Sequence, residues 1–204
     1  MRAVIKWGGS LIDYSEKNIP KIAEMAEEHE ILIVPGAGPF SNLVREIDKK
    51  YGLDPAISHR MAILAMDQYA YFISQWSEKI KCIKDLESMN KKRLSVLLYS
   101  HMEDPFEPSW EVTSDTISAF VAKKTGSMLI IATDVDGVYI KNKLKKEIRA
   151  EEILGKETCV DKAFPKFLIE NKMDAFVVNG KKVHRIRKIL EREDSIYTKI
   201  IGGG

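Results

Sequence analysis

The sequence has only two cysteines, Cys82 and Cys159, and they lie far apart in the chain. Neither belongs to a CxxC pair or to a cysteine and histidine pattern with metal-ligand spacing. This argues against a disulfide framework and against a zinc site. Such sparing use of cysteine is typical of a reducing cytosol, and we therefore expect a cytoplasmic protein.

The sequence also lacks long apolar runs and a strong excess of one charge. No apolar run approaches the length of a membrane-spanning helix. The first residues enter a strand-like segment without a basic region, an apolar stretch and a cleavage site, so we expect a soluble protein. The 32 Lys and Arg residues against 30 Asp and Glu leave a net charge of +2. This small excess predicts no nucleic acid partner.

Two common nucleotide-binding motifs are missing as well. The pattern G-x-x-x-x-G-K-[ST], which cradles phosphates in P-loop NTPases, does not occur in the sequence. The G-x-G-x-x-G pattern of dinucleotide-binding domains is also absent. These absences argue against P-loop NTPases and against dehydrogenases that use a dinucleotide.

What the sequence does have is a strand-like run that ends in glycines, and it has this pattern twice. Residues 4–10 read VIKWGGS, and residues 31–38 read ILIVPGAG. Glycine after a buried strand lets backbone N–H groups approach an anion closely, and a following helix N-terminus adds partial positive charge. Two such turns on neighbouring strands could hold two phosphate groups face to face. Tight packing between helix and strand is the simpler explanation of either turn alone.

The order of apolar segments predicts an α/β fold in one domain, residues 1–204. Strands are expected at 31–34, 94–98, 128–132 and 175–178, and none of them has a polar face. This indicates a mostly parallel sheet with helices on both sides, a three-layer αβα sandwich. Helices are expected near 19–26, with Pro20 near the start, and at 40–51, 55–76, 114–124, 161–170 and 182–191. Further strands are expected at 80–83 and 197–201, and a small hairpin at 138–148.

Three polar features are candidates for chemistry. Lys6 precedes Gly8 by two residues, so its side chain can reach the edge where the glycine amides lie, although it could equally be a surface lysine. Residues 113–116, TSDT, stand at a helix start, where they could cap the helix, or Asp115 could orient lysines from separate segments. Residues 133–137, TDVDG, could form an acidic turn, a magnesium ligand pair or a loop that grips a nucleotide.

Taken together, these pieces resemble the amino acid kinase superfamily. The segments IKWGGS at 5–10, PGAG at 35–38, SD at 114–115 and ATDVDGVY at 132–139, followed by Lys166, occur in the order seen there. The similarity covers essentially the whole chain. It implies the carbamate kinase-like αβα fold and an ATP-dependent phosphotransferase, with an acceptor-binding lobe at roughly 1–125 and an ATP-binding lobe at roughly 126–204.

The resemblance also implies roles for particular residues. Lys6 and Lys166 would neutralise the γ-phosphoryl group, and Asp115 would hold both lysines in register. Magnesium would arrive with ATP, with few or no direct protein ligands. The residues implied to bind ATP besides the two lysines are Gly8, Gly9 and Ser10 at the phosphates and Thr133, Asp134, Asp136, Gly137 and Tyr139 around the adenosine.

Two segments depart from the superfamily pattern. The second lysine is often preceded by Gly-Gly-Met, whereas residues 161–165 here read DKAFP, so Lys162 is a rival to Lys166. Residues 197–200 read YTKI where Gly-Thr-x-Ile is usual, which leaves that contact with the nucleotide open.

The acceptor is suggested by two further segments. Residues 65–70, AMDQYA, and 110–115, WEVTSD, resemble the compact archaeal kinases of methanofuran biosynthesis. That resemblance implies phosphorylation of [5-(aminomethyl)furan-3-yl]methyl phosphate to its diphosphate. The furan would need an aromatic wall, its ammonium a carboxylate and its phosphate several donors. Candidates to bind this acceptor are Gly36, Ala37, Gly38, Phe40, His59, Arg60, Asp67, Tyr69, Trp110, Thr113 and Ser114.

Several alternatives stay open at this point. Phe40 and Tyr69 could be core residues, and His59 could be structural. The acceptor could be isopentenyl phosphate, UMP, acetylglutamate or glutamate, or the protein could bind nucleotides for regulation or store oxyanions. We expect a homo-oligomer, with the apolar helix at 55–76 as its interface, although a buried central helix would explain the same pattern.

Overall fold

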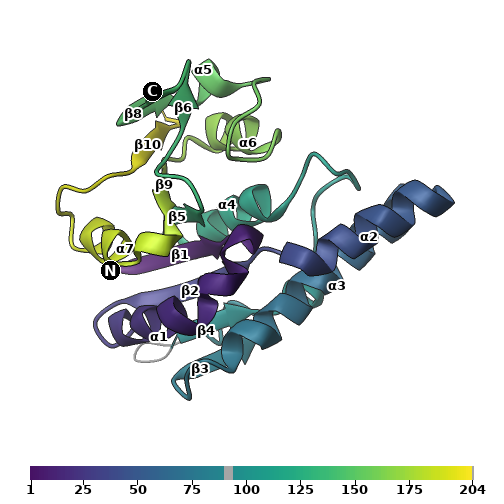
Figure 1. Cartoon of the computed structure of the whole chain (residues 1–204), viewed down its shortest axis with the longest axis horizontal. Coiled ribbons are helices and arrows are strands. Elements are labelled where there is room, and N and C mark those ends of the chain that lie inside the picture. The colour runs from purple at the N-terminus through teal and green to yellow at the C-terminus, as the bar shows by residue number, and fades with distance from the viewer. Residues whose placement is uncertain (90–93, 204) are drawn as a thin grey trace.

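The computed structural model describes residues 1–89 and 94–203, and its centre is an eight-stranded sheet (Figure 1). The strand order is β3-β4-β2-β1-β5-β9-β10-β8, and the pairing is parallel everywhere except between β9 and β10. The strands are β1 (Arg2–Trp7), β2 (Glu30–Pro35), β3 (Ile80–Ile83), β4 (Leu94–Leu97), β5 (Met128–Thr133), β8 (Glu147–Arg149), β9 (Ala175–Asn179) and β10 (Thr198–Ile201). The predicted, mostly parallel sheet is therefore confirmed.

Helices cover both faces of this sheet. They are α1 (Ser15–Met25), α2 (Gly38–Tyr51), α3 (Pro55–Ser74), α4 (Ser114–Thr125), α5 (Ala150–Ile153), α6 (Phe164–Asn171) and α7 (His184–Leu190). Buried residues of α1 and α7 pack in one core cluster, and those of α4, α5 and α6 pack in a second. α2 and α3 lie side by side and extend beyond the sheet as an arm (Figure 1). The αβα sandwich is thus a three-layer structure with one projecting helix pair.

The side chains of the central strand β1 point alternately to the two faces of the sheet. Side chains alternate along a strand, so Ile5 and Trp7 enter the core beneath α1 and α7, and Val4 enters the opposite core beneath α4. Lys6 shares the face of Val4. The alternation therefore directs the lysine toward α4.

The structure differs from the predicted elements in two places, and it confirms the predicted hairpin. α1 begins at Ser15 and continues a 3-10 helix at Gly9–Tyr14, so Pro20 lies inside the helix and not near its start. β8 and α5 were not predicted, because each has four residues or fewer and shows no clear periodicity. The hairpin at 138–148 contains β6 (Tyr139–Ile140) and β7 (Lys143–Leu144), joined by two residues with positive φ, Lys141 and Asn142. Such a turn matches the type that closes tight hairpins.

Within the described residues, no helix combines the length and the hydrophobicity that crossing a membrane requires.

Candidate active site

The two glycine turns lie directly against each other at the carboxyl ends of β1 and β2. The amide of Gly36 donates to the Trp7 carbonyl at 2.8 Å, and a Cβ on Gly36 would stand 2.7 Å from the Gly9 nitrogen. A Cβ on Gly9 would overlap the Gly38 backbone, and Gly38 itself has a φ of +51°. Only glycine permits this approach. Gly9 begins a 3-10 helix and Gly38 begins α2, so both amides stand at helix N-termini, where anions bind.

Lys6 and Asp115 form a buried ion pair beside these turns. The Lys6 Nζ lies 2.8 Å from Asp115 Oδ1, and the exposed fractions of the two residues are 8% and 4%. The ammonium also lies over Gly8, because a Cβ on Gly8 would be 3.4 Å from Nζ. Asp115 stands in the first turn of α4, where the helix dipole favours a carboxylate. The fold thus fixes a buried cation against the first glycine turn.

Asp161 organises the start of α4, and sequence reasoning missed it. Its carboxylate accepts hydrogen bonds from the backbone and hydroxyl groups of Thr113 and Thr116, at 2.6–3.0 Å, and from the Phe164 amide at 2.9 Å. Its own amide donates to Asp115 Oδ2 at 3.0 Å. Burial, followed by the negative charge of Asp115, raises the pKa of Asp161. The helix cap expected from residues 113–116 themselves is therefore supplied by Asp161, which joins the N-termini of α4 and α6.

The second lysine is not where the sequence interpretation placed it. Lys166 is exposed on α6 and pairs with Glu170 at 3.7 Å. Asp115 therefore does not hold both lysines in this structure, although the resemblance implied that it would. The rival Lys162 is exposed too, 3.9 Å from Glu111. Lys166 follows the Phe164-Pro165 start of α6, which packs in the core and leaves the next side chain to solvent. Its role in phosphoryl transfer stays a prediction.

The acidic loop after β5 is anchored by its own aspartate. Asp136 Oδ1 accepts hydrogen bonds from Asn179 at 2.9 Å and from the buried Arg185 at 2.6 Å. The hydrogen bond from Asn179 and the pairing with Arg185 outweigh partial burial and lower the pKa of Asp136. The carboxylate expected to contact ATP or magnesium is thus engaged with protein groups. Thr133 is buried, while Asp134 and Tyr139 are exposed and free to line a nucleotide site.

Thr198 explains the unusual segment at 197–200. Its side chain is fully buried, and its Oγ1 accepts a hydrogen bond from the Val138 amide at 2.8 Å. Gly137 has a φ of +153°, and a Cβ there would overlap Thr198 Oγ1. Thr198 therefore supports the loop at 133–139 through its contacts with Gly137 and Val138. These contacts account for a threonine at this position without the nucleotide contact that the superfamily pattern suggested.

A cavity of about 540 Å³ opens beside the glycine turns. It lies between the turns, one face of α2, the start of α3 and the segment before α4. Of the predicted acceptor residues, those that line it are Gly36, Ala37, Gly38, His59, Trp110, Thr113 and Ser114, together with Gly9 and Ser10 from the first turn. Sequence reasoning missed four polar lining residues on α2, namely Ser41, Asn42, Arg45 and Asp48. The last three recur every three residues along α2, which is the signal that could have found them.

Four predicted acceptor residues lie outside this lining. Phe40 packs on the core with its ring 6.4 Å from that of Tyr69, which is fully buried and bonds Ser15 through its hydroxyl. Burial raises the pKa of Tyr69 to about 12. Asp67 is buried and accepts a hydrogen bond from the Ser100 amide at 3.3 Å. Arg60 is exposed and donates to the Ser100 carbonyl. The helical pattern of α3 alone could not show which side chains face the core.

His59 lines the cavity but is held by a neighbour. Its Nε2 lies 2.6 Å from Asp104 Oδ2, and the other oxygen of Asp104 accepts a hydrogen bond from the Tyr99 hydroxyl at 3.1 Å. Burial opposes ionisation of Asp104, but the bonds from His59 and from the Phe106 amide outweigh it and lower the pKa of this carboxyl. These contacts support a structural role for His59. The part of its ring that lines the cavity remains available to an acceptor.

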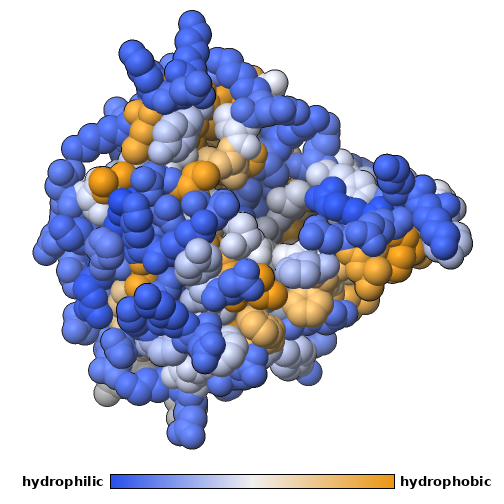
Figure 2. Space-filling model, in the orientation of Figure 1, coloured by the Kyte–Doolittle hydropathy of each residue, from blue (hydrophilic) through white to orange (hydrophobic). Residues whose placement is uncertain are grey.

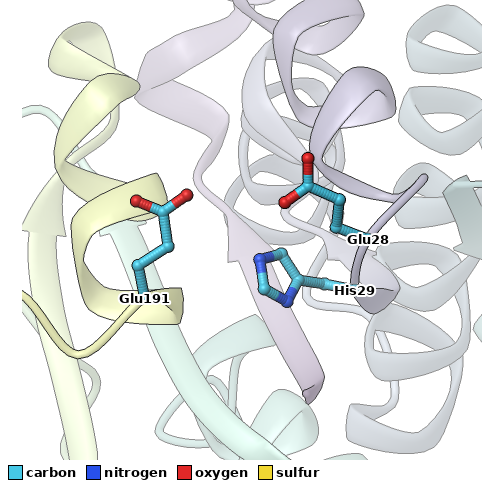
Figure 3. A group of neighbouring side chains, drawn as sticks. All are labelled: Glu28, His29 and Glu191. Carbon is cyan, nitrogen blue, oxygen red and sulfur yellow. The ribbon is translucent and has the colours of Figure 1, made fainter.

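A separate cluster of potential metal ligands, drawn in Figure 3, lies near the start of β2. Within residues 1–89 and 94–203, Glu28, His29 and Glu191 are the one such group whose ligand atoms lie within 4.8 Å of one another. Glu28 and His29 precede β2, whereas the glycine turn follows β2. This cluster is thus remote from the cavity and contributes nothing to a phosphate site there.

Comparison with known proteins agrees with this geometry. Residues 1–191 match the model of the amino acid kinase family. The chain is 38% identical to the [5-(aminomethyl)furan-3-yl]methyl phosphate kinase of Methanocaldococcus jannaschii, with 98% of this chain and 97% of that protein covered. It is 25% identical to the uridylate kinase of Methanococcus aeolicus, with 96% of this chain and 97% of that protein covered.

A solved structure supports the fold. The uridylate kinase of Archaeoglobus fulgidus superposes with a TM-score of 0.78 at 19% sequence identity, covering 98% of this chain and 100% of that one. At this level of sequence identity, the structural similarity supports the fold alone.

Proposed function

The chain belongs to the amino acid kinase family and is a kinase, and from this premise we propose that its acceptor is [5-(aminomethyl)furan-3-yl]methyl phosphate. ATP would supply the γ-phosphoryl group and the product would be the diphosphate. Because the relatives are kinases, the alternatives of a regulatory or an oxyanion-storing protein are set aside. The higher identity to the furan phosphate kinase than to the uridylate kinases supports this acceptor, and UMP is the second candidate.

The observation that carries the proposal is the buried Lys6–Asp115 pair against Gly8 of the first glycine turn, next to Gly9 and Ser114, which line the cavity. Phosphoryl transfer needs positioning and cationic charge more than it needs covalent help from the protein. We assign the acceptor phosphate to the Gly36–Gly38 turn, through the amides of Ala37 and Gly38, because the Gly36 amide donates to Trp7. The ATP phosphates are assigned to Gly8, Gly9 and Ser10. Lys6 would then lie between donor and acceptor.

The reaction follows from this placement. An oxygen of the acceptor phosphate attacks the γ-phosphorus of ATP, a new P–O bond forms, and the bond to the β-phosphate oxygen breaks to release ADP. Negative charge gathers on the transferred group and on the leaving oxygen, and the Lys6 ammonium stabilises both. Lys166 is assigned the second cationic role, which requires its exposed side chain to turn inward. Magnesium bound to ATP would supply additional charge compensation.

The loop at 133–139 is assigned to the adenosine, with residues 126–204 as the ATP-binding lobe. Thr133, Asp134, Gly137 and Tyr139 stay in this assignment. Asp136 acts by anchoring the loop to Asn179 and Arg185. Rigid anchoring reduces the conformational entropy that is lost when a nucleotide binds.

We further propose a homodimer in the cytoplasm. Large apolar side chains are exposed along the arm of α2 and α3 (Figure 2), namely Leu43, Tyr51, Ile57, Leu64 and Tyr71. Such a concentration is typical of surfaces that are covered by a partner. Sedimentation analysis would test this, and a monomer at micromolar concentration would refute it.

An acceptor panel tests the proposed function. The protein is incubated with ATP, magnesium and one acceptor at a time, chosen from the furan phosphate, UMP, isopentenyl phosphate, acetylglutamate and glutamate, and ADP release is measured. We expect the highest kcat/KM with the furan phosphate. ADP release with UMP alone would reject this acceptor and leave the family assignment intact.

A further inference from the structure

We propose that Asp48 binds the ammonium group of the acceptor and that Trp110 holds the Asp48 carboxylate in position. This inference rests on the proposed function, since it concerns the acceptor that the same cavity would take. It replaces Asp67, the carboxylate that the sequence suggested for this purpose.

The first argument is the charge of the cavity wall. Among the described residues that line the cavity, Asp48 carries the one carboxylate. Its Oδ2 accepts a hydrogen bond from Trp110 Nε1 at 2.7 Å, and this bond fixes the carboxylate. Within the described part of the chain, no cation pairs with Asp48, and its Oδ1 accepts no hydrogen bond. A carboxylate can accept several hydrogen bonds, so Oδ1 is available to a ligand.

The second argument is the position of Arg45, the arginine that lines the cavity. Arg45 stands one turn before Asp48 on α2 and could have neutralised it. Its guanidinium instead lies over the Trp110 ring, 4.0 Å from the ring centroid. Guanidinium groups favour the face of an aromatic ring, because the ring quadrupole is negative there. The cation is thus held by Trp110, and the charge of Asp48 is left for a partner from outside.

The third argument is the distance between the two ends of the cavity. Asp48 lies ten residues beyond Gly38 on the same helix, which corresponds to a rise of about 15 Å. Bond lengths place the phosphorus and the amine of the furan phosphate about 8 Å apart. Hydrogen bonds add about 3 Å at each end, so one acceptor molecule would span about 14 Å. Its phosphate can therefore reach the glycine turn while its ammonium reaches Asp48.

This arrangement distinguishes between acceptors. A charge-assisted hydrogen bond to a carboxylate is stronger than a neutral one. An acceptor with a neutral ring, such as UMP, has no cation to place against Asp48. Asp48 would therefore favour phosphates that carry an ammonium arm.

The test compares two acceptors in wild type and in Asp48→Asn. One is the furan phosphate, and the other is its analogue with a methyl group in place of the aminomethyl group. Asparagine keeps an oxygen for Trp110 but removes the charge. We expect kcat/KM for the furan phosphate to fall by about tenfold or more, and that for the analogue to stay within about twofold. Glu46→Gln is the matched control, because it removes an exposed carboxylate from α2 outside the cavity, and we expect it to change neither value.

Equal losses for both acceptors, or no loss for either, would overturn the role of Asp48. If circular dichroism shows that Asp48→Asn does not fold, the comparison of the two acceptors in the wild-type protein decides. Equal kcat/KM values for the two acceptors there would also overturn the role of Asp48. A wild-type protein that turns over UMP but neither furan compound would instead reject the proposed function, and with it this inference. The two failures differ in whether the furan phosphate is consumed.

Discussion

The ammonium of Lys6 on β1 lies 2.8 Å from the carboxylate of Asp115 on α4, and both side chains are buried. Removing two charges from water costs several kcal/mol for each ion, so such a pair contributes little net stability by itself. Loss of one partner is far more costly, because the other charge stays buried and uncompensated. A pair of this kind, buried against the first glycine turn, is therefore consistent with the catalytic role proposed for Lys6.

Lys6→Met tests this view of the pair. The substitution keeps the length and apolar character of the side chain and removes the ammonium, so we expect kcat to fall by about two to three orders of magnitude. Stability should fall as well, by about 3–5 kcal/mol, because Asp115 is left without a cation. Steady-state kinetics and urea unfolding measure the two effects.

The double variant Lys6→Met with Asp115→Asn separates these effects. Neutralising both partners removes the buried charge, so we expect most of the lost stability to return while kcat stays low. Turnover near the wild-type rate in either variant would contradict the catalytic assignment of Lys6.

The sequence predicted the position of Lys6 because strand alternation is a local rule. A buried run with a lysine two residues before a glycine defines both the face and the edge of β1. Likewise, β3 and α2 were predicted almost to their end residues, since apolar periodicity and glycine mark them clearly. The sheet followed from strands without a polar face.

Asp161 and Asp48 could not be found in this way. Asp161 caps two helices whose N-termini meet only in the folded chain. Asp48 is fixed by Trp110, which lies 62 residues away in the sequence. Asp67 and Asp48 look alike as carboxylates within helices, and only the packing of α2 against α3 decides which one faces the cavity. Long-range pairing of polar groups carries no local signal.

The two exposed lysines near α6 allow a direct comparison. We expect Lys166→Ala to lower kcat by about tenfold or more, and Lys162→Ala to leave kcat within about twofold. Both side chains are exposed, so neither substitution should change the unfolding midpoint measurably. Kinetics at saturating ATP and acceptor check this. A loss confined to Lys162→Ala would transfer the second cationic role to Lys162.

Gly9→Ala tests the contact between the glycine turns. The new methyl group would overlap the Gly38 backbone, which cannot move without shifting the start of α2. We expect a loss of about 1–3 kcal/mol in unfolding free energy, together with raised KM values for both ATP and acceptor. Ser10→Ala is the control for the stability measurement alone, since its side chain is exposed and its loss leaves the turns in contact; its KM for ATP is not used, because Ser10 is itself assigned to the ATP phosphates. If Gly9→Ala binds both substrates normally, the turns are not the phosphate sites.

The anchoring of the nucleotide loop predicts a dependence of stability on pH. Bonds from Asn179 and Arg185 hold the pKa of Asp136 below its usual value. A carboxyl with a lowered folded pKa contributes stability above its unfolded pKa of about 4 and loses it as pH falls through the folded pKa. We therefore expect Asp136→Asn to destabilise the protein by about 1–3 kcal/mol at pH 7, and the difference from wild type to shrink below pH 4.

Urea unfolding of both proteins between pH 7 and pH 2.5 measures this difference. Asp194→Asn serves as the control, because Asp194 pairs with Lys146 at the surface, where solvent screens the pair. We expect that variant to follow wild type at every pH. A contribution from the charge of Asp136 must vanish once the wild-type carboxyl is protonated. If the loss of unfolding free energy in Asp136→Asn stays constant down to pH 2.5, the side chain instead stabilises the loop by its shape and its neutral hydrogen bonds.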